Sequence, residues 1–314
     1  MRISALLAVA ALAVPASADQ LQRLTLEARG ALGAGFGTAA GIEALPKGRR
    51  APHRRRLPSP QAPYGAPHQD PYYRCNRPLV HVDNSGYIYK DGNRLGSSAR
   101  DFKTSCNGLV AWRDSSNNVY KESDRLGWNA QSYDIAWNTG DVMWKNSSGD
   151  IHKNSDRLGW SSQREQINHW TGTVVWVNSS GAIHKDSNQL GWSSQEFAQA
   201  LFTGDVVWKN SSGYLYKNDR QLGSGARSFK ISDYTGTVAW LDNSGYIYRD
   251  DDRLGSGVSR YEQAAYSGDV VWLDNSRYLY KNSDRIGSGV REFRMEPDGR
   301  ILWVDDSGRP HFVQ

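Results

Sequence analysis

A tryptophan that returns every 32 residues constrains the fold of this chain more than any other feature. The recurring residues are Trp112, Trp144, Trp176, Trp208, Trp240 and Trp272, and Trp303 follows at a spacing of 31. His81 holds the equivalent position 31 residues before Trp112. A fixed period of this size indicates a repeat architecture, in which each unit buries its faces against its neighbours.

The unit around Trp208 has the pattern of a small antiparallel sheet. Residues 205–209 form a short apolar run that suits a strand packed on both faces, and 214–217 alternate like a second strand. Between them lies a turn in which Gly213 is expected to have a positive φ, and Asn117 takes this place in the second unit. Arg277 suits the place poorly and indicates a local adjustment in the seventh unit. The pair Leu222-Gly223 is expected to close the next turn. Residues 228–231 predict a third strand, and a fourth would be very short.

Units of this kind favour an all-β fold, a β-propeller of seven or eight short blades of about 32 residues that spans 74–314. An open solenoid is the alternative. We prefer the propeller because the first and last units are incomplete and could complete each other to close a ring. No helix longer than two turns is expected.

The residues before the repeats differ in character. Residues 1–18 read as a secretory signal peptide, with Arg2, an apolar core and a small-residue cleavage site. Residues 19–56 contain the basic clusters 49–50 and 54–56 and predict either a trimmed pro-segment or a disordered leader. Residues 57–73 are expected to be a linker. No other run is long and apolar enough to span a membrane.

Charge separates the leader from the repeats. Residues 1–70 hold 9 of the 38 Lys and Arg residues and 4 of the 33 Asp and Glu residues, which leaves 29 of each in 71–314. The repeat region is therefore formally neutral and gives no electrostatic reason to expect a nucleic-acid partner.

Cys75 and Cys106 are the two cysteines of the chain. In a secreted protein such a pair predicts a disulfide, which would stabilise by ~3 kcal/mol in the chain-entropy model. A zinc site is the alternative, but two cysteines without paired histidines do not make one. We expect no metal and no cofactor.

The position after each Leu-Gly pair is the first candidate binding site. It holds Trp128, Trp160 and Trp192 in three units and serine in four others, so packing does not require an aromatic ring there. An indole beside a turn is expected to be exposed and to offer a face to a sugar ring. The alternative is that these rings pack over neighbouring loops.

Acidic and basic residues just before Leu-Gly are the second candidate. Planar polar groups can bind sugar hydroxyls through paired hydrogen bonds, or can pair with each other across units. The candidate pairs are Asp124 and Arg125, Asp156 and Arg157, Asp252 and Arg253, and Asp284 and Arg285.

Three hairpin turns contain glycosylation sequons, at Asn146, Asn178 and Asn210. Related turns lack the further carboxylates of a calcium loop.

Catalysis needs unlike residues at one unique place, whereas nearly every polar residue here has counterparts in other units. The chain is therefore expected not to be an enzyme.

The segment that runs from Thr235 to Tyr248, followed by Leu254-Gly255, resembles a tectonin-type β-propeller repeat, and the resemblance covers 79–314. It implies a secreted, extracellular lectin that binds glycans or cell-surface glycoconjugates at repeated weak sites. A secreted protein-interaction scaffold or effector is the alternative, and a glycan-active enzyme comes third. The units are shorter than tectonin repeats, and the oligomeric state is not predicted.

Overall fold

The computed structural model describes residues 75, 77–296 and 299–313. The chain divides between Ala66 and Pro67 into two units, and all of the described residues belong to the second. The predicted signal peptide, basic leader and linker lie outside the described residues and stay predictions.

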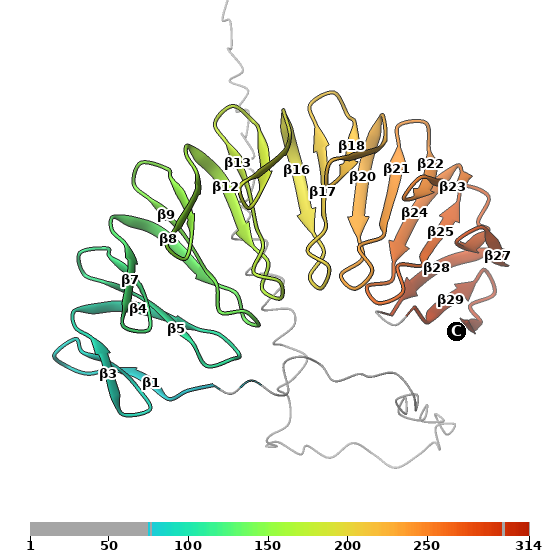
Figure 1. Cartoon of the computed structure of the whole chain (residues 1–314). Coiled ribbons are helices and arrows are strands. Elements are labelled where there is room, and N and C mark those ends of the chain that lie inside the picture. The colour runs from blue at the N-terminus through green and yellow to red at the C-terminus, as the bar shows by residue number, and fades with distance from the viewer. Residues whose placement is uncertain (1–74, 76, 297–298, 314) are drawn as a thin grey trace, which may run out of the picture. The chain divides into compact units, whose positions relative to one another are not determined.

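The described residues form eight small antiparallel sheets, which we call blades 1 to 8 in chain order (Figure 1). Blades 2 to 7 each have four strands, paired in the order in which they occur along the chain, and blades 1 and 8 have three. The strands of blades 1 to 4 are β1 (Val80–Val82), β2 (Ile88–Lys90) and β3 (Asn93–Gly96); β4 (Ala99–Thr104), β5 (Val110–Asp114), β6 (Val119–Lys121) and β7 (Asp124–Gly127); β8 (Ala130–Ile135), β9 (Val142–Asn146), β10 (Ile151–Lys153) and β11 (Asp156–Gly159); and β12 (Ser162–Ile167), β13 (Val174–Asn178), β14 (Ile183–Lys185) and β15 (Asn188–Gly191). Those of blades 5 to 8 are β16 (Ser194–Gln199), β17 (Val206–Asn210), β18 (Leu215–Lys217) and β19 (Arg220–Gly223); β20 (Ala226–Ile231), β21 (Val238–Asp242), β22 (Tyr246–Arg249) and β23 (Asp252–Ser256); β24 (Val258–Gln263), β25 (Val270–Asp274), β26 (Leu279–Lys281) and β27 (Asp284–Gly287); and β28 (Val290–Met295), β29 (Ile301–Asp305) and β30 (Pro310–Val313).

This arrangement confirms the predicted all-β fold of the propeller class, with about 32 residues to a blade. The part of the chain that the structure describes contains no helix. Blade 1 lacks a counterpart of the first strand, and blade 8 lacks a counterpart of the fourth. Because no pairing among the described strands joins blades 1 and 8, the expectation that they complete each other in one sheet is not met there.

The repeated tryptophan packs between blades, as predicted. Trp208 is 2% exposed and lies in one apolar cluster with Val206 of its own blade and Val175, Val177 and Ile183 of the preceding blade. The cores therefore lie between consecutive blades, so a blade is stabilised mainly by its neighbours.

The glycine of each Leu-Gly pair makes this packing possible. A Cβ atom on Gly191 would lie 2.3 Å from Cη2 of Trp208, and Gly127 and Gly159 stand in the same relation to the next tryptophan. These glycines end the fourth strands with φ outside the left-handed region, so the prediction that Leu-Gly closes a turn is wrong. Glycine is required there because the indole of the next blade occupies the space of a side chain.

The turn between the third and fourth strands holds the tryptophan from its other end. Asp186 has a φ of 49°, and its carbonyl accepts a hydrogen bond of 2.8 Å from Nε1 of Trp176. Its carboxylate accepts a second bond, of 3.0 Å, from the backbone N–H of Val174. In blades 3 and 5, Asn154 and Asn218 accept the two equivalent bonds, through the backbone carbonyl and the side-chain Oδ1. Aspartate and asparagine suit the position because they tolerate the left-handed conformation and can accept the second bond.

Backbone hydrogen bonds also join consecutive blades. At the first turns of blades 5 and 6, the N–H of Phe202 donates to the carbonyl of Asp233 over 2.8 Å, and that of Tyr234 donates to the carbonyl of Ala265 over 3.1 Å. The positive φ values of Gly213 and Asn117, at 79° and 61°, confirm the turn predicted between the second and third strands. Arg277 has the same conformation, with a φ of 64°, so the adjustment expected in the seventh unit is not seen.

Candidate functional site

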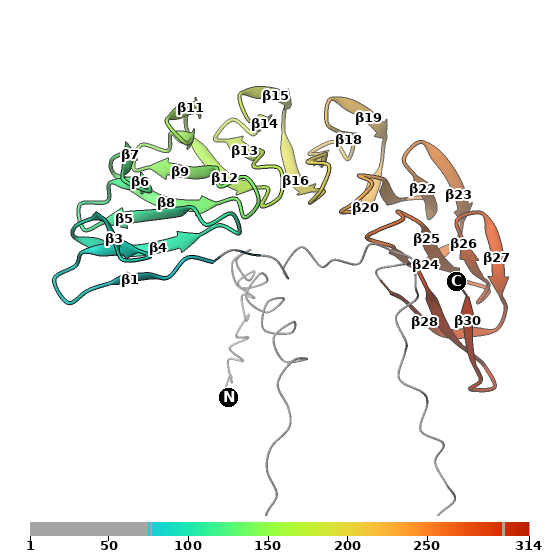
Figure 2. The ribbon, with the colours of Figure 1, turned by 60° about the horizontal axis from the view of Figure 1, so that its bottom comes forward.

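Three indole rings project from one edge of the molecule. Trp128, Trp160 and Trp192 directly follow the fourth strands β7, β11 and β15, and they are 63%, 65% and 58% exposed. Fourth strands are edge strands, and Figure 2 shows them along the same side of successive blades. The structure therefore places these rings where the sequence predicted them, on the surface at equivalent points of three consecutive blades.

In blades 1, 5, 6 and 7 the equivalent residue is serine, but each of these blades has an aromatic ring on the neighbouring third strand or directly before it. Ser256 faces Tyr246 on the neighbouring third strand. The equivalent position, directly before the third strand, holds Tyr87 in blade 1, Tyr214 in blade 5 and Tyr278 in blade 7. In blades 2 to 4, which carry the tryptophans, the same position holds the small or polar residues Asn118, Asp150 and Ala182. Each of blades 1 to 7 thus has one aromatic ring at this edge.

An arginine of the fourth strand lies over most of these rings. Cζ of Arg125 is 5.9 Å from the ring centroid of Trp128, and Cζ of Arg157 is 5.8 Å from that of Trp160. Arg253 and Arg285 lie closer to their tyrosines, at 4.9 Å from Tyr246 and 4.7 Å from Tyr278, as Arg94 does to Tyr87 at 3.7 Å. Distances in this range are typical of cation–π contacts.

The aspartates of the second candidate set do not join this group. Asp124, Asp156, Asp252 and Asp284 are exposed, but each precedes its arginine in a strand, and adjacent residues of a strand face opposite sides. The register pairs Asp124 with Lys121 and Arg125 with Tyr120. The structure therefore brings the arginines to the aromatic rings and leaves the aspartates on the other face.

The sequon asparagines are part of hairpin turns. Oδ1 of Asn178 accepts hydrogen bonds from the N–H groups of Ser180 and Ala182, and Asn210 makes the same pair of bonds. Nδ2 of Asn146 donates to Asp150 over 2.9 Å. Glycosylation at the three positions stays a prediction, and at Asn146 it would replace this bond.

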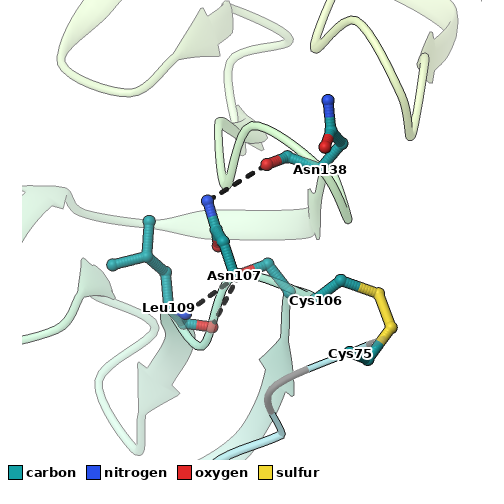
Figure 3. Close-up of a disulfide and its surroundings, with 6 residues drawn as sticks. Cys75, Cys106, Asn107, Leu109 and Asn138 are labelled. Carbon is teal, nitrogen blue, oxygen red and sulfur yellow. Dashed lines mark hydrogen bonds between the residues drawn. A yellow bond between two sulfur atoms is a disulfide. The ribbon is translucent and has the colours of Figure 1, made fainter. Parts of the chain in front are cut away.

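The predicted disulfide joins Cys75 to Cys106 (Figure 3). Cys106 lies in the first turn of blade 2, where its N–H donates to the carbonyl of Trp137 in blade 3 over 2.7 Å. Nδ2 of the neighbouring Asn107 donates to the carbonyl of Asn138 over 3.1 Å. The bond thus ties the segment that precedes β1 to the boundary between blades 2 and 3.

A row of aromatic rings at the first turns escaped the sequence analysis. Trp170, Phe202, Tyr234 and Tyr266 follow one another at the 32-residue period, with ring centroids 4.8, 3.9 and 4.3 Å apart along the row. Tyr234 is 36% exposed. The same spacing that identified the core tryptophans could have revealed this row.

A hollow between blades 2 and 3 also escaped it. The hollow has a volume of about 390 Å³ and lies against Arg100, Arg113 and Asn117 of blade 2, the segment Asn129–Gln131 and Ser147 of blade 3. Burial would raise the pKa of Asp101, the ion-pair partner of Arg113, but hydrogen bonds from Arg113 and Tyr133 outweigh burial and lower this pKa. Burial, with the Asp101 carboxylate, raises the pKa of Tyr133, so Asp101 is the charged partner of the two.

Among the described residues no group of three or more His, Cys, Asp or Glu side chains is placed to hold a metal ion. The same residues contain no helix long and apolar enough to cross a membrane.

No protein-family model matches the sequence, and no curated protein matches it. Among solved structures, the chain is similar to the β-propeller domain of Myceliophteria thermophila Cps50 (Swd1), with 8% identity, coverage of 76% of this chain and 100% of that one, and a TM-score of 0.31. It is also similar to Kluyveromyces lactis Hsv2p, with 12% identity, coverage of 59% and 74%, and a TM-score of 0.31. A chain of the mitotic checkpoint complex shows 12% identity, coverage of 88% and 99%, and a TM-score of 0.29. The strand pairing, rather than these likenesses, identifies the chain as an all-β repeat protein of the propeller class.

Proposed function

We propose that this chain is an extracellular, multivalent binding protein without catalytic activity, which binds saccharides on the exposed indoles of blades 2 to 4. The observation that supports it most is the exposure of Trp128, Trp160 and Trp192, at 58–65%, at equivalent points of consecutive blades. Large rings are costly to expose without a ligand, and tryptophan is the residue type most often found at binding hot spots.

Weak but repeated sites suit this geometry. Aromatic stacking contributes ~0.5–1.5 kcal/mol beyond burial, so a single indole would bind a sugar weakly. Three sites on one edge can engage one polymeric ligand, and linked binding events raise the apparent affinity without new contacts. The predicted signal peptide and the resemblance to tectonin-type repeats are consistent with this role outside the cell.

A protein-interaction scaffold is the second candidate. The observation that favours it is the row Trp170, Phe202, Tyr234 and Tyr266, which offers a contiguous and partly exposed apolar strip across four blades. Apolar strips with aromatic anchors are typical of protein interfaces. On this interpretation the row, and not the indole edge, would carry the function.

One experiment separates the two candidates. The variant Trp128→Ser/Trp160→Ser/Trp192→Ser introduces the residue that blades 1, 5, 6 and 7 carry at this point. The matched control Ser224→Ala/Ser256→Ala/Ser288→Ala changes the same position in blades 5 to 7. Both variants are tested on immobilised glycans and for their melting temperature.

We expect the tryptophan variant to keep its melting temperature within about 3 °C, because it opens no core cavity, and to lose at least tenfold in avidity. The control should bind like the wild type. Unchanged glycan binding would place the sugar contact elsewhere. Absence of glycan binding by the wild type, together with a protein partner lost on Tyr234→Ser, would favour the scaffold.

A further inference from the structure

The hollow between blades 2 and 3 differs from the rest of this repetitive molecule in holding two arginines. Guanidinium groups are suited to carboxylates and phosphates because their donors match such planar anions. Both Arg100 and Arg113 line the hollow, and the remaining lining is mostly amide and hydroxyl groups from Asn117, Asn129, Gln131 and Ser147.

Arg113 is held in place by its neighbours. Its Nη2 donates to Oδ2 of Asp101 over 2.6 Å, and its Nη1 donates to the carbonyls of Ala130 and Gln131 over 3.3 and 3.2 Å. Its Nε is buried and has no partner within the described residues. The charge of Arg113 is therefore balanced by Asp101, and its fixed position shapes the wall of the hollow.

Arg100 forms no ion pair within the described residues, although its charge contributes to the lowered pKa of Asp101. It is exposed, and its Nη1 donates over 3.2 Å to a neutral acceptor, Oδ1 of Asn117. Among the described residues no carboxylate lies within ion-pair distance of it. Asp101 is thus the one carboxylate shown to interact with both arginines, and a ligand anion in the hollow would meet a net positive charge beside several neutral donors.

No other blade in the described range combines these two residues. The position of Arg100 holds Gln131, Gln163 and Gln195 in blades 3 to 5, and the position of Arg113 holds Lys145, Val177 and Lys209. Arg227 and Arg291 repeat Arg100 in blades 6 and 8, but Leu241 and Val304 then stand where Arg113 would be. The repeat thus supplies a matched arginine, Arg227, that has Leu241 in place of the second arginine.

The hollow also adjoins the first exposed indole. Asn129, which lines it, directly follows Trp128 in the link from blade 2 to blade 3. A sugar ring stacked on Trp128 would place the next unit of the same polymer within reach of these polar groups.

We propose that this hollow binds the carboxylate of a uronic acid unit through Arg100, in an acidic polysaccharide of which a neighbouring ring stacks on Trp128. The inference rests on the proposed saccharide binding and names the class of saccharide. The neutral donors bind the hydroxyls of the same unit, and Arg113 with Asp101 fixes the wall without contributing net charge. A volume of about 390 Å³ has room for one such unit and not for a long oligomer.

The test compares two charge-matched variants. Arg100→Gln introduces the residue of blades 3 to 5, and Arg227→Gln removes the same charge from the same position of blade 6. Binding of an α-1,4-linked galacturonic acid hexamer, and of the same hexamer with its carboxylates methyl-esterified, is measured by calorimetry at two salt concentrations.

We expect the wild type to prefer the acidic hexamer, Arg100→Gln to bind it at least tenfold more weakly, and Arg227→Gln to stay within twofold of the wild type. The preference should fall as salt is raised, and Arg100→Gln should leave the weak binding of the ester unchanged. Equal losses in the two arginine variants would overturn the proposal, since they would indicate general charge.

The remaining outcomes separate this inference from the proposed function. Equal binding of the acidic and esterified hexamers, lost in the tryptophan variant, would overturn the uronic acid site and leave saccharide binding intact. Binding of neither hexamer, with no glycan bound by the wild type on any surface, would overturn both.

Discussion

At the scale of single residues, glycine and tryptophan determine each other's positions across the boundary between blades. The contact is tight in the middle of the array, where a Cβ on Gly127 would lie 2.1 Å from Cη2 of Trp144. It is looser at blade 8, where a Cβ on Gly287 would lie 2.9 Å from Cζ2 of Trp303. Neither glycine has a φ in the left-handed region, so the two positions differ only in how much space the neighbouring indole leaves for a side chain.

This difference predicts that an added methyl group destabilises the protein more at Gly127 than at Gly287. Gly127→Ala should lower the free energy of unfolding by about 1–3 kcal/mol, as overpacking does in well-packed cores. Gly287→Ala serves as the matched control and should cost clearly less, because the indole needs to move less. Urea unfolding followed by tryptophan fluorescence measures both, and equal costs in the two variants would contradict the packing role.

Some residues could be assigned from the sequence and others could not. The 32-residue period identifies the core tryptophans, and serine at equivalent positions of other blades identifies the indoles that packing does not require. Both groups lie where they were predicted. The glycine after leucine was misread as a turn because the ring that excludes its side chain comes from another blade. The hollow beside Arg100 could not be predicted, since it depends on three segments whose juxtaposition no local pattern reveals.

At the scale of one sheet, each blade carries a row of side chains from strand to strand. In blade 2 the register aligns Phe102, Trp112, Tyr120 and Arg125, and the rings of Trp112 and Tyr120 stack with centroids 4.1 Å apart. The hydroxyl of Tyr120 donates to Oδ2 of Asp114 in the adjoining turn over 3.1 Å. The third-strand residue thus links the core tryptophan to the hairpin turn.

Blades 3 and 4 have histidine in this row, and its environment favours the neutral form. His152 stacks on Trp144 and His184 on Trp176, and neither nitrogen of either ring has a partner within the described residues. The adjoining turn residues are Asn146 and Asn178, which carry no charge. Loss of hydration on burial lowers the pKa of both histidines.

These two histidines should make the protein less stable in mild acid. Because their pKa is lower in the folded chain, protons bind the unfolded chain more readily once the pH falls below about 6.5, and stability declines from there towards the folded pKa. The variant His152→Tyr/His184→Tyr introduces the pairing of blade 5, where Tyr216 stacks on Trp208 beside Asn210.

The melting temperature of the wild type should therefore fall further than that of the variant between pH 7.5 and pH 5. Carboxylates with a lowered pKa, such as Asp114 and Asp269, titrate at lower pH and are common to both proteins. Parallel melting curves over this range would show that the imidazoles are not the acid-sensitive groups.

At the scale of the whole repeat array, contacts run from one blade to the next, so stability is expected to be a sum over blades and their boundaries. The middle boundaries are alike, each with a buried tryptophan against a glycine. Blade 1 differs, because His81 stands at the tryptophan position, is exposed, and stacks on Tyr89 at a wider 5.1 Å between centroids. What holds blade 1 in addition is the disulfide from Cys75 to Cys106 in blade 2.

The disulfide should stabilise blade 1 without affecting distant blades. A bond that closes a separation of 31 residues contributes about 3–4 kcal/mol in the chain-entropy model, and both of its ends lie at blades 1 and 2. In an array held by nearest neighbours this energy should protect blade 1 and leave distant blades alone. Hydrogen exchange of the variant Cys75→Ser/Cys106→Ser should therefore show faster exchange in Ile88–Lys90 and Asn93–Gly96, with β17 and β21 unchanged.

The isosteric change removes the bond without adding bulk, and reduction of the wild type by dithiothreitol provides an independent route to the same state. Faster exchange spread evenly over all blades would mean that the array unfolds as one cooperative unit, which would contradict the nearest-neighbour account. Unchanged exchange in blade 1 would mean that the contacts of Ile88 with Val110 and Trp112 in blade 2 suffice to hold it, because these three residues form one buried cluster whether or not the sulfurs are joined.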